Sequence, residues 1–131
     1  MVRHNEMDNS NTLIFVVDDD AAVRNSLKFS LEIDGFAVRT YANANELLRA
    51  GDLTACRCLI VDQDMPRMQG LELVAALRKQ GVNVPAVLIS GHVTPALTRQ
   101  ASDADIPVIE KPFLGNQLIE ILHTRLGAKP G

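Results

Sequence analysis

The sequence has 131 residues, of which 47% are hydrophobic and 22% are charged, and these proportions are typical of one globular domain. A chain of this size buries about two-thirds of its unfolded surface, so its stability requires neither a disulfide framework nor a structural metal. The formal net charge of -3 provides no general attraction to nucleic acid or anionic lipid, which argues against direct nucleic acid binding by this chain.

The sequence contains no apolar run near the roughly 20 residues that cross a bilayer, and its first residues hold no apolar signal-peptide core. It therefore predicts a cytoplasmic protein with no membrane contact.

Residues 1–12 are polar and aperiodic, which predicts a flexible N-terminal tail, followed by one domain over 13–127 and a C-terminal tail over 128–131. Two cysteines, Cys56 and Cys58, are too few and too close for a zinc site and are expected to be buried thiols.

Apolar runs with high β propensity alternate with segments of helical periodicity along the domain. Strands are expected at residues 13–17, 36–40, 58–61, 86–89 and 108–109. Helices are expected from 21 to 34, around 46–50, from 71 to 80, over 95–101 and from about 118 to 127. Because continuous apolar strands are typical of sheets buried on both faces, the alternation predicts an α/β fold with a doubly wound parallel sheet and right-handed crossovers.

Two details of these elements follow from residue type. Asp20 and Asn43 stand directly before helical segments and are expected to cap them. The aromatic rings of Phe15, Phe29 and Phe36 are expected to lie in the core.

Polar and charged residues follow four of the five expected strands. Asp18, Asp19 and Asp20 follow the first strand, Asp62 and Asp64 the third, Ser90 the fourth and Lys111 the fifth. Taken singly, each has an ordinary structural explanation as a helix cap, a turn residue or a solvated loop residue. In open α/β sheets, however, the carboxyl ends of the strands share one edge, where ligands bind, so these side chains are expected to converge.

Several carboxylates gathered at one edge would raise one another's pKa unless a divalent cation lay among them. Oxygen ligands with no nearby His or Cys favour Mg²⁺ or a similar ion. The charges of Asp18, Asp19 and Asp62 are then balanced by one Mg²⁺ and Lys111. A phosphoryl group joined to one carboxylate would add about one negative charge, to which the cation, Lys111, the Ser90 hydroxyl and backbone N–H groups would respond. The cluster therefore predicts a charge-driven switch.

Four sequence motifs together resemble the response-regulator receiver domain of two-component signal transduction. They are VVDDD (16–20), VDQDMPRMQGLE (61–72), LISGH (88–92) and IEKPF (109–113). They occur in the order and spacing of that family, and the resemblance covers almost the whole chain after residue 12. It implies a flavodoxin-like fold, with five parallel strands in the order 2-1-3-4-5 and five helices.

The resemblance also assigns roles to the converging side chains. It implies that Asp62 is the phosphoacceptor and that Asp18, Asp19 and Asp62, together with the Asp64 backbone carbonyl, hold Mg²⁺. Ser90 and Lys111 would bind the phosphoryl oxygens, and the Lys111–Pro112 peptide is expected to be cis. Asp64 and His92 stand two places after the acceptor and the hydroxyl residue, so their side chains are expected to set the lifetime of the phosphoryl group.

The resemblance implies a phosphoryl donor, either a sensor histidine kinase or a phosphotransfer protein, and a receiver that catalyses both the transfer and the later hydrolysis. Such a chain is a self-phosphorylating and self-dephosphorylating switch, not a metabolic enzyme. Its signal would pass to a downstream protein or to an output domain, because SGH and IEKPF resemble receivers attached to LuxR-type DNA-binding domains.

One position affects how the signal leaves the site. Val108 stands where relatives often carry an aromatic residue that rotates on signalling, and a valine is too short and stiff for this movement. Residues 91–105, with the surface near Val93 and Leu97, are therefore expected to change on phosphorylation instead.

Two other functions stay open at this stage. A haloacid-dehalogenase-like phosphatase also forms an aspartyl phosphate at an Asp-x-Asp element, which Asp62 and Asp64 provide, but in that class the element lies near the N-terminus. A phosphorylation-independent pseudo-receiver would keep the fold as a docking module, but it usually lacks one of the acids or the lysine, and all are present here.

Overall fold

The computed structural model of the chain describes residues 12–49, 52–112 and 115–126. Its strands are β1 (Leu13–Val17), β2 (Ala37–Tyr41), β3 (Cys58–Asp62), β4 (Ala86–Ser90) and β5 (Val108–Glu110). Its helices are α1 (Ala21–Ile33), α2 (Ala44–Arg49), α3 (Gly70–Lys79), α4 (Pro95–Asp103) and α5 (Gly115–Leu126), with a short 3₁₀ helix at Leu53–Ala55. Most of the expected N-terminal tail, the C-terminal tail and the end of the last helix at 127 lie outside the described residues.

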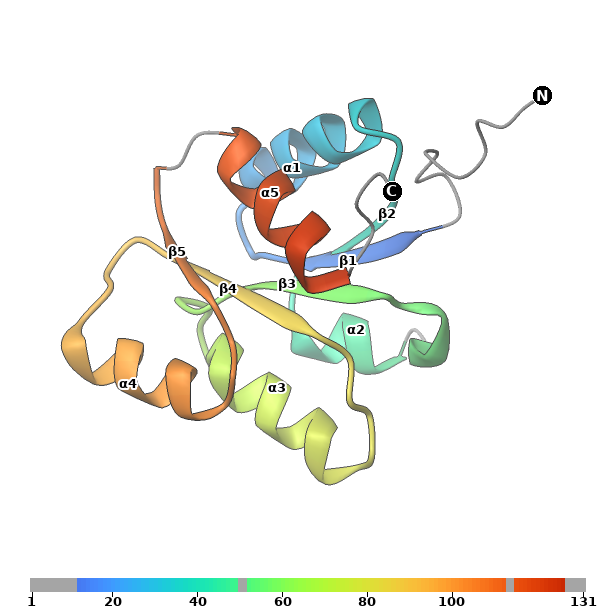
Figure 1. Ribbon diagram of the computed structural model, residues 1–131. Helices are drawn as coiled ribbons and strands as arrows, with labels where there is room; N and C mark the ends of the chain where they lie inside the picture. Colours follow the sequence, from blue (N-terminus) through green and yellow to red (C-terminus); the bar gives the residue numbers. More distant parts are fainter. Residues whose placement is uncertain (1–11, 50–51, 113–114, 127–131) are drawn as a thin grey trace.

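The five strands form one parallel sheet in the order β2-β1-β3-β4-β5, which confirms the expected topology. Helices α1 and α5 cover one face of the sheet, and α2, α3 and α4 cover the other (Figure 1). Alternate residues of β1 serve the two faces: Ile14 and Val16 pack with the α1 and α5 side, and Phe15 and Val17 with the other. A strand buried on both faces needs a continuous apolar run, which explains why the run in the sequence predicted this sheet.

Polar residues form the last position of two central strands. Strands β3 and β4 each extend one residue past the apolar run, so Asp62 and Ser90 belong to the sheet. Asp62 pairs with Ile89, and Ser90 with Glu110. The register therefore fixes the two backbones on adjacent strands, one residue apart, at the carboxyl edge of the sheet.

The expected caps are confirmed. The Asp20 carboxylate accepts a hydrogen bond from the Ala22 N–H at 2.9 Å, and the Asn43 side chain accepts one from the Glu46 N–H at 2.9 Å. Each side chain satisfies one of the N–H groups that the first turn of a helix leaves without an intrahelical partner.

The expectation that Phe29 lies in the core is wrong, because 67% of its surface is exposed. The buried stripe of α1 contains Leu27 and Leu31, four residues apart. Phe29 lies two residues from each, and at 3.6 residues per turn this places its side chain on the opposite side of the helix. Helical phase, and not residue type, decides its position.

Cys56 and Cys58 are buried free thiols, as the sequence predicts. Burial raises the pKa of Cys56 to about 11 and that of Cys58 to about 12. The two side chains join the hydrophobic clusters on opposite faces of the sheet. Both thiols therefore stay protonated at neutral pH and act as small core residues.

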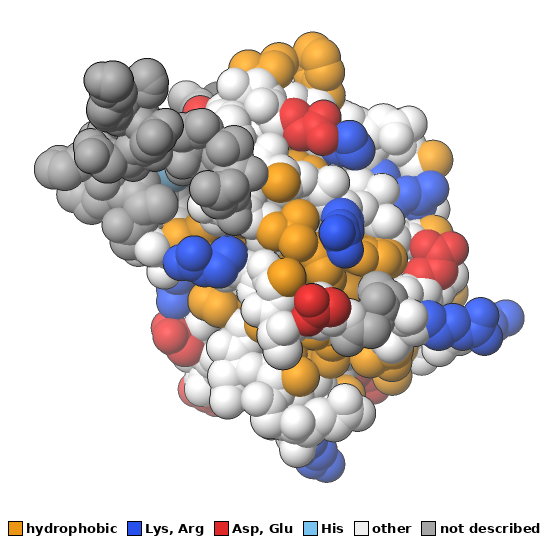
Figure 2. Space-filling view, turned by 90° about the vertical axis from the view of Figure 1, so that its right-hand side faces the viewer, with side chains coloured by type: hydrophobic (Ala, Val, Ile, Leu, Met, Phe, Trp, Pro, Cys, Tyr) orange, Lys and Arg blue, Asp and Glu red, His pale blue; other side chains and the backbone are white. Residues whose placement is uncertain are grey.

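No helix among the described residues is long and apolar enough to cross a membrane. Figure 2 views the molecule from the amino ends of the strands, where basic and acidic side chains are scattered among hydrophobic ones. Charges of both signs share this face, in keeping with the small net charge of -3.

Candidate functional site

Three carboxylates meet at the carboxyl edge of the sheet, as the sequence predicts. Asp18 and Asp19 follow β1, and Asp62 ends β3, the strand that pairs with β1. Each of these residues offers one carboxylate oxygen, and the three oxygens lie within 4.8 Å of one another. Asp18 and Asp62 are buried, whereas Asp19 is exposed, so the cluster opens to solvent on one side.

Asp18 is fully buried at the base of the cluster. Its Oδ1 accepts a hydrogen bond from the Asp20 N–H at 2.9 Å. Its Oδ2 is buried without a hydrogen-bond partner among the described residues and lies 3.5 Å from Lys111 Nζ. Burial raises the pKa of this carboxyl above its ordinary value. Arg24, which the sequence does not single out, fixes the loop by donating to the Asp18 carbonyl oxygen at 2.7 Å.

Asp62 is 2% exposed and lies at the centre of the edge. Its Oδ1 accepts hydrogen bonds from the Asp64 N–H at 3.0 Å and from Lys111 Nζ at 3.4 Å. Burial and the negative charge of Asp18 raise the pKa of Asp62 to about 6, although these two donors oppose the shift. The ionised form of Asp62 is therefore disfavoured, and a bound cation would stabilise it.

Lys111 places one positive charge between two of the carboxylates. Its Nζ lies 3.5 Å from Asp18 Oδ2 and 3.4 Å from Asp62 Oδ1. Its backbone N–H donates to the Ser90 carbonyl oxygen at 2.8 Å. Burial works against its charge, but the two aspartates outweigh burial and raise the pKa of Lys111. The Lys111–Pro112 peptide is cis, as expected.

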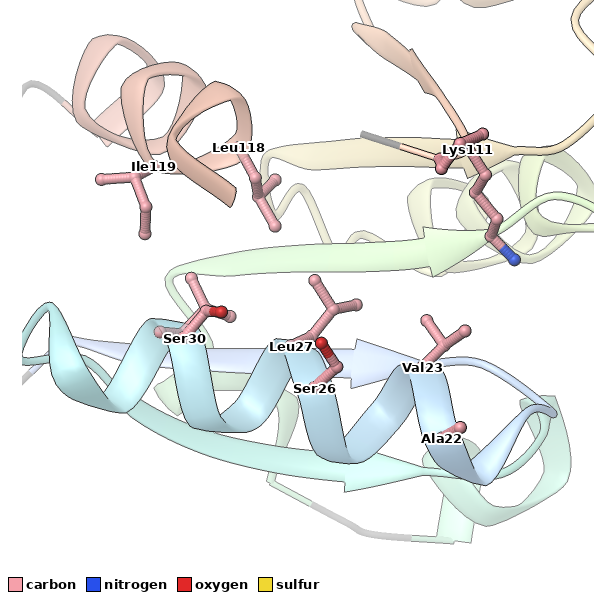
Figure 3. Close-up of a pocket in the computed structure, with 10 residues that line it drawn as sticks. Ala22, Val23, Ser26, Leu27, Ser30, Lys111, Leu118 and Ile119 are labelled. Carbon is pink, nitrogen blue, oxygen red and sulfur yellow. The ribbon is translucent and has the colours of Figure 1, made fainter. Parts of the chain in front are cut away.

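A groove of about 580 Å³ lies beside the acidic cluster, between α1 and α5. Val23, Leu27 and Leu118 line its apolar walls, and Lys111 closes one end (Figure 3). The lysine side chain extends past the groove toward the carboxylates, so its aliphatic part borders an apolar surface and only its ammonium enters the site.

Ser90 and Asp64 contact each other through their side chains, which spacing in the sequence does not reveal. Ser90 is fully buried, and its hydroxyl donates to the Asp64 carboxylate, with Oγ 3.0 Å from Oδ2 and 3.2 Å from Oδ1. Asp64 Oδ2 also accepts from the Gly91 N–H at 2.8 Å, and Ser90 Oγ accepts from the His92 N–H at 3.0 Å. The Asp64 side chain thus joins the β3–α3 loop to the β4–α4 loop.

The donor set fits a small hard cation. The side-chain groups of the cluster are carboxylates, which are the ligands that Mg²⁺ prefers. The buried Asp18 Oδ2, which lacks a hydrogen bond among the described residues, is the kind of polar atom that a bound ion satisfies. Lys111 alone offsets one of three negative charges, so the residues present leave room for a divalent charge.

Two residues that the sequence does not single out, Gly70 and Gln63, hold α3 against the end of β3 beside Asp62. A Cβ added at Gly70 would lie 2.8 Å from the Asp62 carbonyl oxygen, so only glycine fits between α3 and the end of β3. The buried Gln63 side chain accepts a hydrogen bond from the Leu71 N–H at 2.8 Å, which anchors the start of α3. A glycine or glutamine inside a motif signals only a turn or a polar loop until the sheet register is known.

The expected signalling surface is partly corrected. Leu97 is 7% exposed and packs in the core beneath α4, whereas Val93 is half-buried and His92 is exposed. Leu97 lies on the inner side of α4, which begins at Pro95 as expected and ends at Asp103, two residues later than expected. Thr94 caps the start of this helix by accepting from the Leu97 N–H at 3.1 Å. The surface near Leu97 is therefore formed by the residues on the outer side of α4.

Without a bound cation, the free energy of unfolding should decrease as the pH rises from about 4 to about 7. The pKa of Asp62 rises from 3.8 to about 6 in the folded chain, so folding favours the protonated carboxyl. This stabilisation is complete below pH 4 and is lost as the pH passes 6, by an amount on the order of 3 kcal/mol. Urea unfolding at a series of pH values measures it. Asp62→Asn should flatten this dependence, and an equally steep dependence in that variant would assign the effect to other groups.

Comparisons with known proteins agree with this geometry. A sequence model described as the response regulator receiver domain matches residues 14–123. The C4-dicarboxylate transport transcriptional regulatory protein DctR of Rhodobacter capsulatus is 35% identical over 121 residues, which cover 90% of this chain and 61% of DctR. The transcriptional regulatory protein FixJ of Rhizobium meliloti is 34% identical over 111 residues, which cover 84% of this chain and 54% of FixJ. The chain therefore spans little more than half the length of these relatives.

One solved structure extends the likeness to three dimensions. The crystal structure of FixJ-N superposes with a TM-score of 0.78 at 32% identity, and the match covers 92% of this chain and 97% of that chain. The likeness in three dimensions thus covers most of the chain.

Proposed function

Because the chain belongs to the family of response regulator receiver domains of two-component systems, we propose that it accepts a phosphoryl group on Asp62 and thereby switches a protein-interaction surface. The donor is a sensor histidine kinase or a phosphotransfer protein. The observation that carries the proposal is the buried Asp62 carboxylate, which lies 3.4 Å from Lys111 and shares its site with Asp18 and Asp19.

In the transfer, an Asp62 oxygen attacks the phosphorus atom of the donor's phosphohistidine. The P–O bond forms as the P–N bond breaks, and the electron pair of that bond stays on the imidazole nitrogen. Lys111, which lies 3.4 Å from Asp62, and the Ser90 hydroxyl would bind oxygens of the transferred group, so the protein would contribute positioning and charge in addition to the nucleophile. Water later attacks the acyl phosphate, and the exposed Asp64 and His92 are proposed to influence this step.

Mg²⁺ fits the same edge. Asp18, Asp19 and Asp62, together with the Asp64 backbone carbonyl, would hold it. When bound, the ion neutralises the carboxylates and the phosphoryl oxygens. Asp18 is buried and fixed by the Asp20 N–H, so it would be a rigid ligand, and the exposed Asp19 would bind the ion from the solvent side.

The receiver is proposed to comprise residues 13–127, to act in the cytoplasm and to pass its signal to a downstream protein or to an output domain. The expected route is a change over residues 91–105, which follow Ser90 directly. All five side chains that such chemistry requires are present in this sequence, which favours a phosphorylated receiver over a pseudo-receiver.

Incubation with acetyl phosphate tests the function, with intact mass as the readout. Wild-type chain should gain one phosphate in the presence of Mg²⁺ and none when the metal is chelated. The chain should not hydrolyse p-nitrophenyl phosphate, which a haloacid-dehalogenase-like phosphatase would turn over. Absence of any phosphate gain would favour the pseudo-receiver, and turnover of the ester would favour the phosphatase.

Two neighbouring aspartates separate metal binding from helix capping. Asp19→Ala should weaken Mg²⁺ binding at least roughly tenfold, because it removes one of few carboxylate ligands. Asp20→Ala is the matched control: it removes the same charge and the α1 cap, which costs about 1 kcal/mol of stability but no ligand. Mg²⁺ titration measures both variants. Equal affinities in the two variants would remove Asp19 from the proposed metal site.

A further inference from the structure

The Asp64 carboxylate occupies two hydrogen-bond donors at the start of the β4–α4 loop. It accepts from the Ser90 hydroxyl at 3.0 Å and from the Gly91 N–H at 2.8 Å, both through Oδ2. Asp64 is 26 positions from Ser90 and 27 from Gly91 in the sequence, and it meets them only because β3 pairs with β4. The two donors form a small anion-binding pair, and an anionic side chain already fills it.

A phosphoryl group on Asp62 would arrive beside this pair. Asp62 pairs with Ile89, the residue before Ser90, and the Asp64 N–H donates to Asp62 Oδ1 at 3.0 Å. The Ser90 hydroxyl has one proton and can donate to one acceptor at a time. The Asp64 carboxylate and a phosphoryl oxygen therefore compete for the same proton, and their negative charges repel each other.

We propose that the Asp64 side chain acts as an internal competitor of the phosphoryl group. The Asp64 carboxylate must leave Ser90 and Gly91 before the phosphorylated state can form. This inference rests on the proposed function. Asp64 is a positioning residue in this role, since it acts through the two donors that it occupies. Its side chain is exposed, so the released carboxylate is hydrated and no buried charge is left behind.

The competition lowers the affinity of the site for a phosphoryl group. A ligand that binds only the open state has an apparent affinity reduced by the fraction of chains in that state. Removing the carboxylate should leave both donors free and increase that fraction. A side chain that merely braced the two loops would have the opposite effect, because its loss would loosen Ser90 and weaken binding.

Binding of beryllium fluoride in the presence of Mg²⁺ measures the effect, since BeF₃⁻ mimics a phosphoryl group on a carboxylate. Titration of the full chain, followed by ¹⁹F NMR, should show binding about tenfold tighter in Asp64→Ala than in wild type. Asp64→Asn should lie between the two, because its amide oxygen still accepts from Gly91 but carries no charge. Asp105→Asn is the control for net charge, as Asp105 contacts Arg125 at the opposite edge of the sheet and its loss should leave the affinity unchanged.

The same substitution made in Ser90→Ala chains tests whether the effect depends on Ser90. In Ser90→Ala chains, Asp64 retains only the Gly91 N–H, so Asp64→Ala should tighten binding less, about threefold. Affinity that is equal or weaker in both Asp64 variants would overturn the competition while leaving phosphorylation of Asp62 intact. Absence of BeF₃⁻ binding in wild type would overturn this inference and the proposed function together, so the two failures are distinguishable.

Discussion

Asp62→Asn is expected to abolish phosphorylation by acetyl phosphate, with a loss of at least roughly a thousandfold in rate, because a neutral amide oxygen is a poor nucleophile. The same change should preserve the fold. Asn has nearly the same volume, keeps an oxygen for the Asp64 N–H and removes a buried charge beside Asp18. At pH 7 without Mg²⁺ the variant should therefore be more stable than wild type, which separates lost chemistry from lost structure.

Intact mass and urea unfolding on the same samples check both parts. If the variant still gained a phosphate at the wild-type rate, the phosphoacceptor would be a residue other than Asp62. A variant that was destabilised at neutral pH would contradict the conclusion that the ionised Asp62 carboxylate lowers the free energy of unfolding.

Gly70→Ala is expected to destabilise the chain by about 2 to 3 kcal/mol. The added methyl group would lie 2.8 Å from the Asp62 carbonyl oxygen, 2.9 Å from Val61 Cγ1 and 3.0 Å from Leu88 Cδ2. The nearest of these atoms belongs to the backbone of a central strand, so α3 or the end of β3 has to move. Such a shift displaces Asp62, and phosphorylation should slow as well.

Gly91→Ala is the matched control for this prediction, because its Cβ would have a neighbour only at 3.9 Å, in Asp64 Oδ2. Its effect on the free energy of unfolding should stay within about 0.5 kcal/mol. Thermal or urea unfolding compares the two variants. Equal stability of Gly70→Ala and wild type would show that α3 is not held tightly against the strand.

The charge balance of the edge connects these results. Asp18 and Asp62 are buried close together with Lys111 as their nearby cation, and burial raises the pKa of both carboxyls. The protonation of these two carboxyls should therefore respond strongly to a bound divalent cation and to the negative charge that a phosphoryl group adds. Added Mg²⁺ should increase stability most above pH 6, where Asp62 is ionised.

The fold follows from the sequence because its strongest signals are local. The apolar runs that became β1, β3 and β4 need burial on both faces, and only a parallel sheet between two helical layers provides it. The residues that end these strands are polar, so the hydrophobic pattern stops before the backbone pairing does, and Asp62 and Ser90 lie one residue inside the sheet instead of after it.

Contacts between segments that are distant in the sequence could not be predicted from it. The hydrogen bond from Ser90 to Asp64 joins residues 26 positions apart and depends on the register of β3 against β4. The exposure of Phe29 depends on its phase relative to Leu27 and Leu31, which its residue type does not reveal. The converging acids and the lysine were predictable, because the topology brings every strand's carboxyl end to one edge.

Chemical trapping of the acyl phosphate identifies the residue that carries the phosphoryl group. Borohydride reduces an aspartyl phosphate to the corresponding alcohol, homoserine, and releases the phosphate, so peptide sequencing by mass spectrometry locates the modified residue. After incubation with acetyl phosphate and Mg²⁺, we expect homoserine at position 62 and aspartate at positions 18, 19 and 64. Homoserine at any of those three positions with an unmodified Asp62, or no homoserine in chains that carry a phosphate, would contradict it.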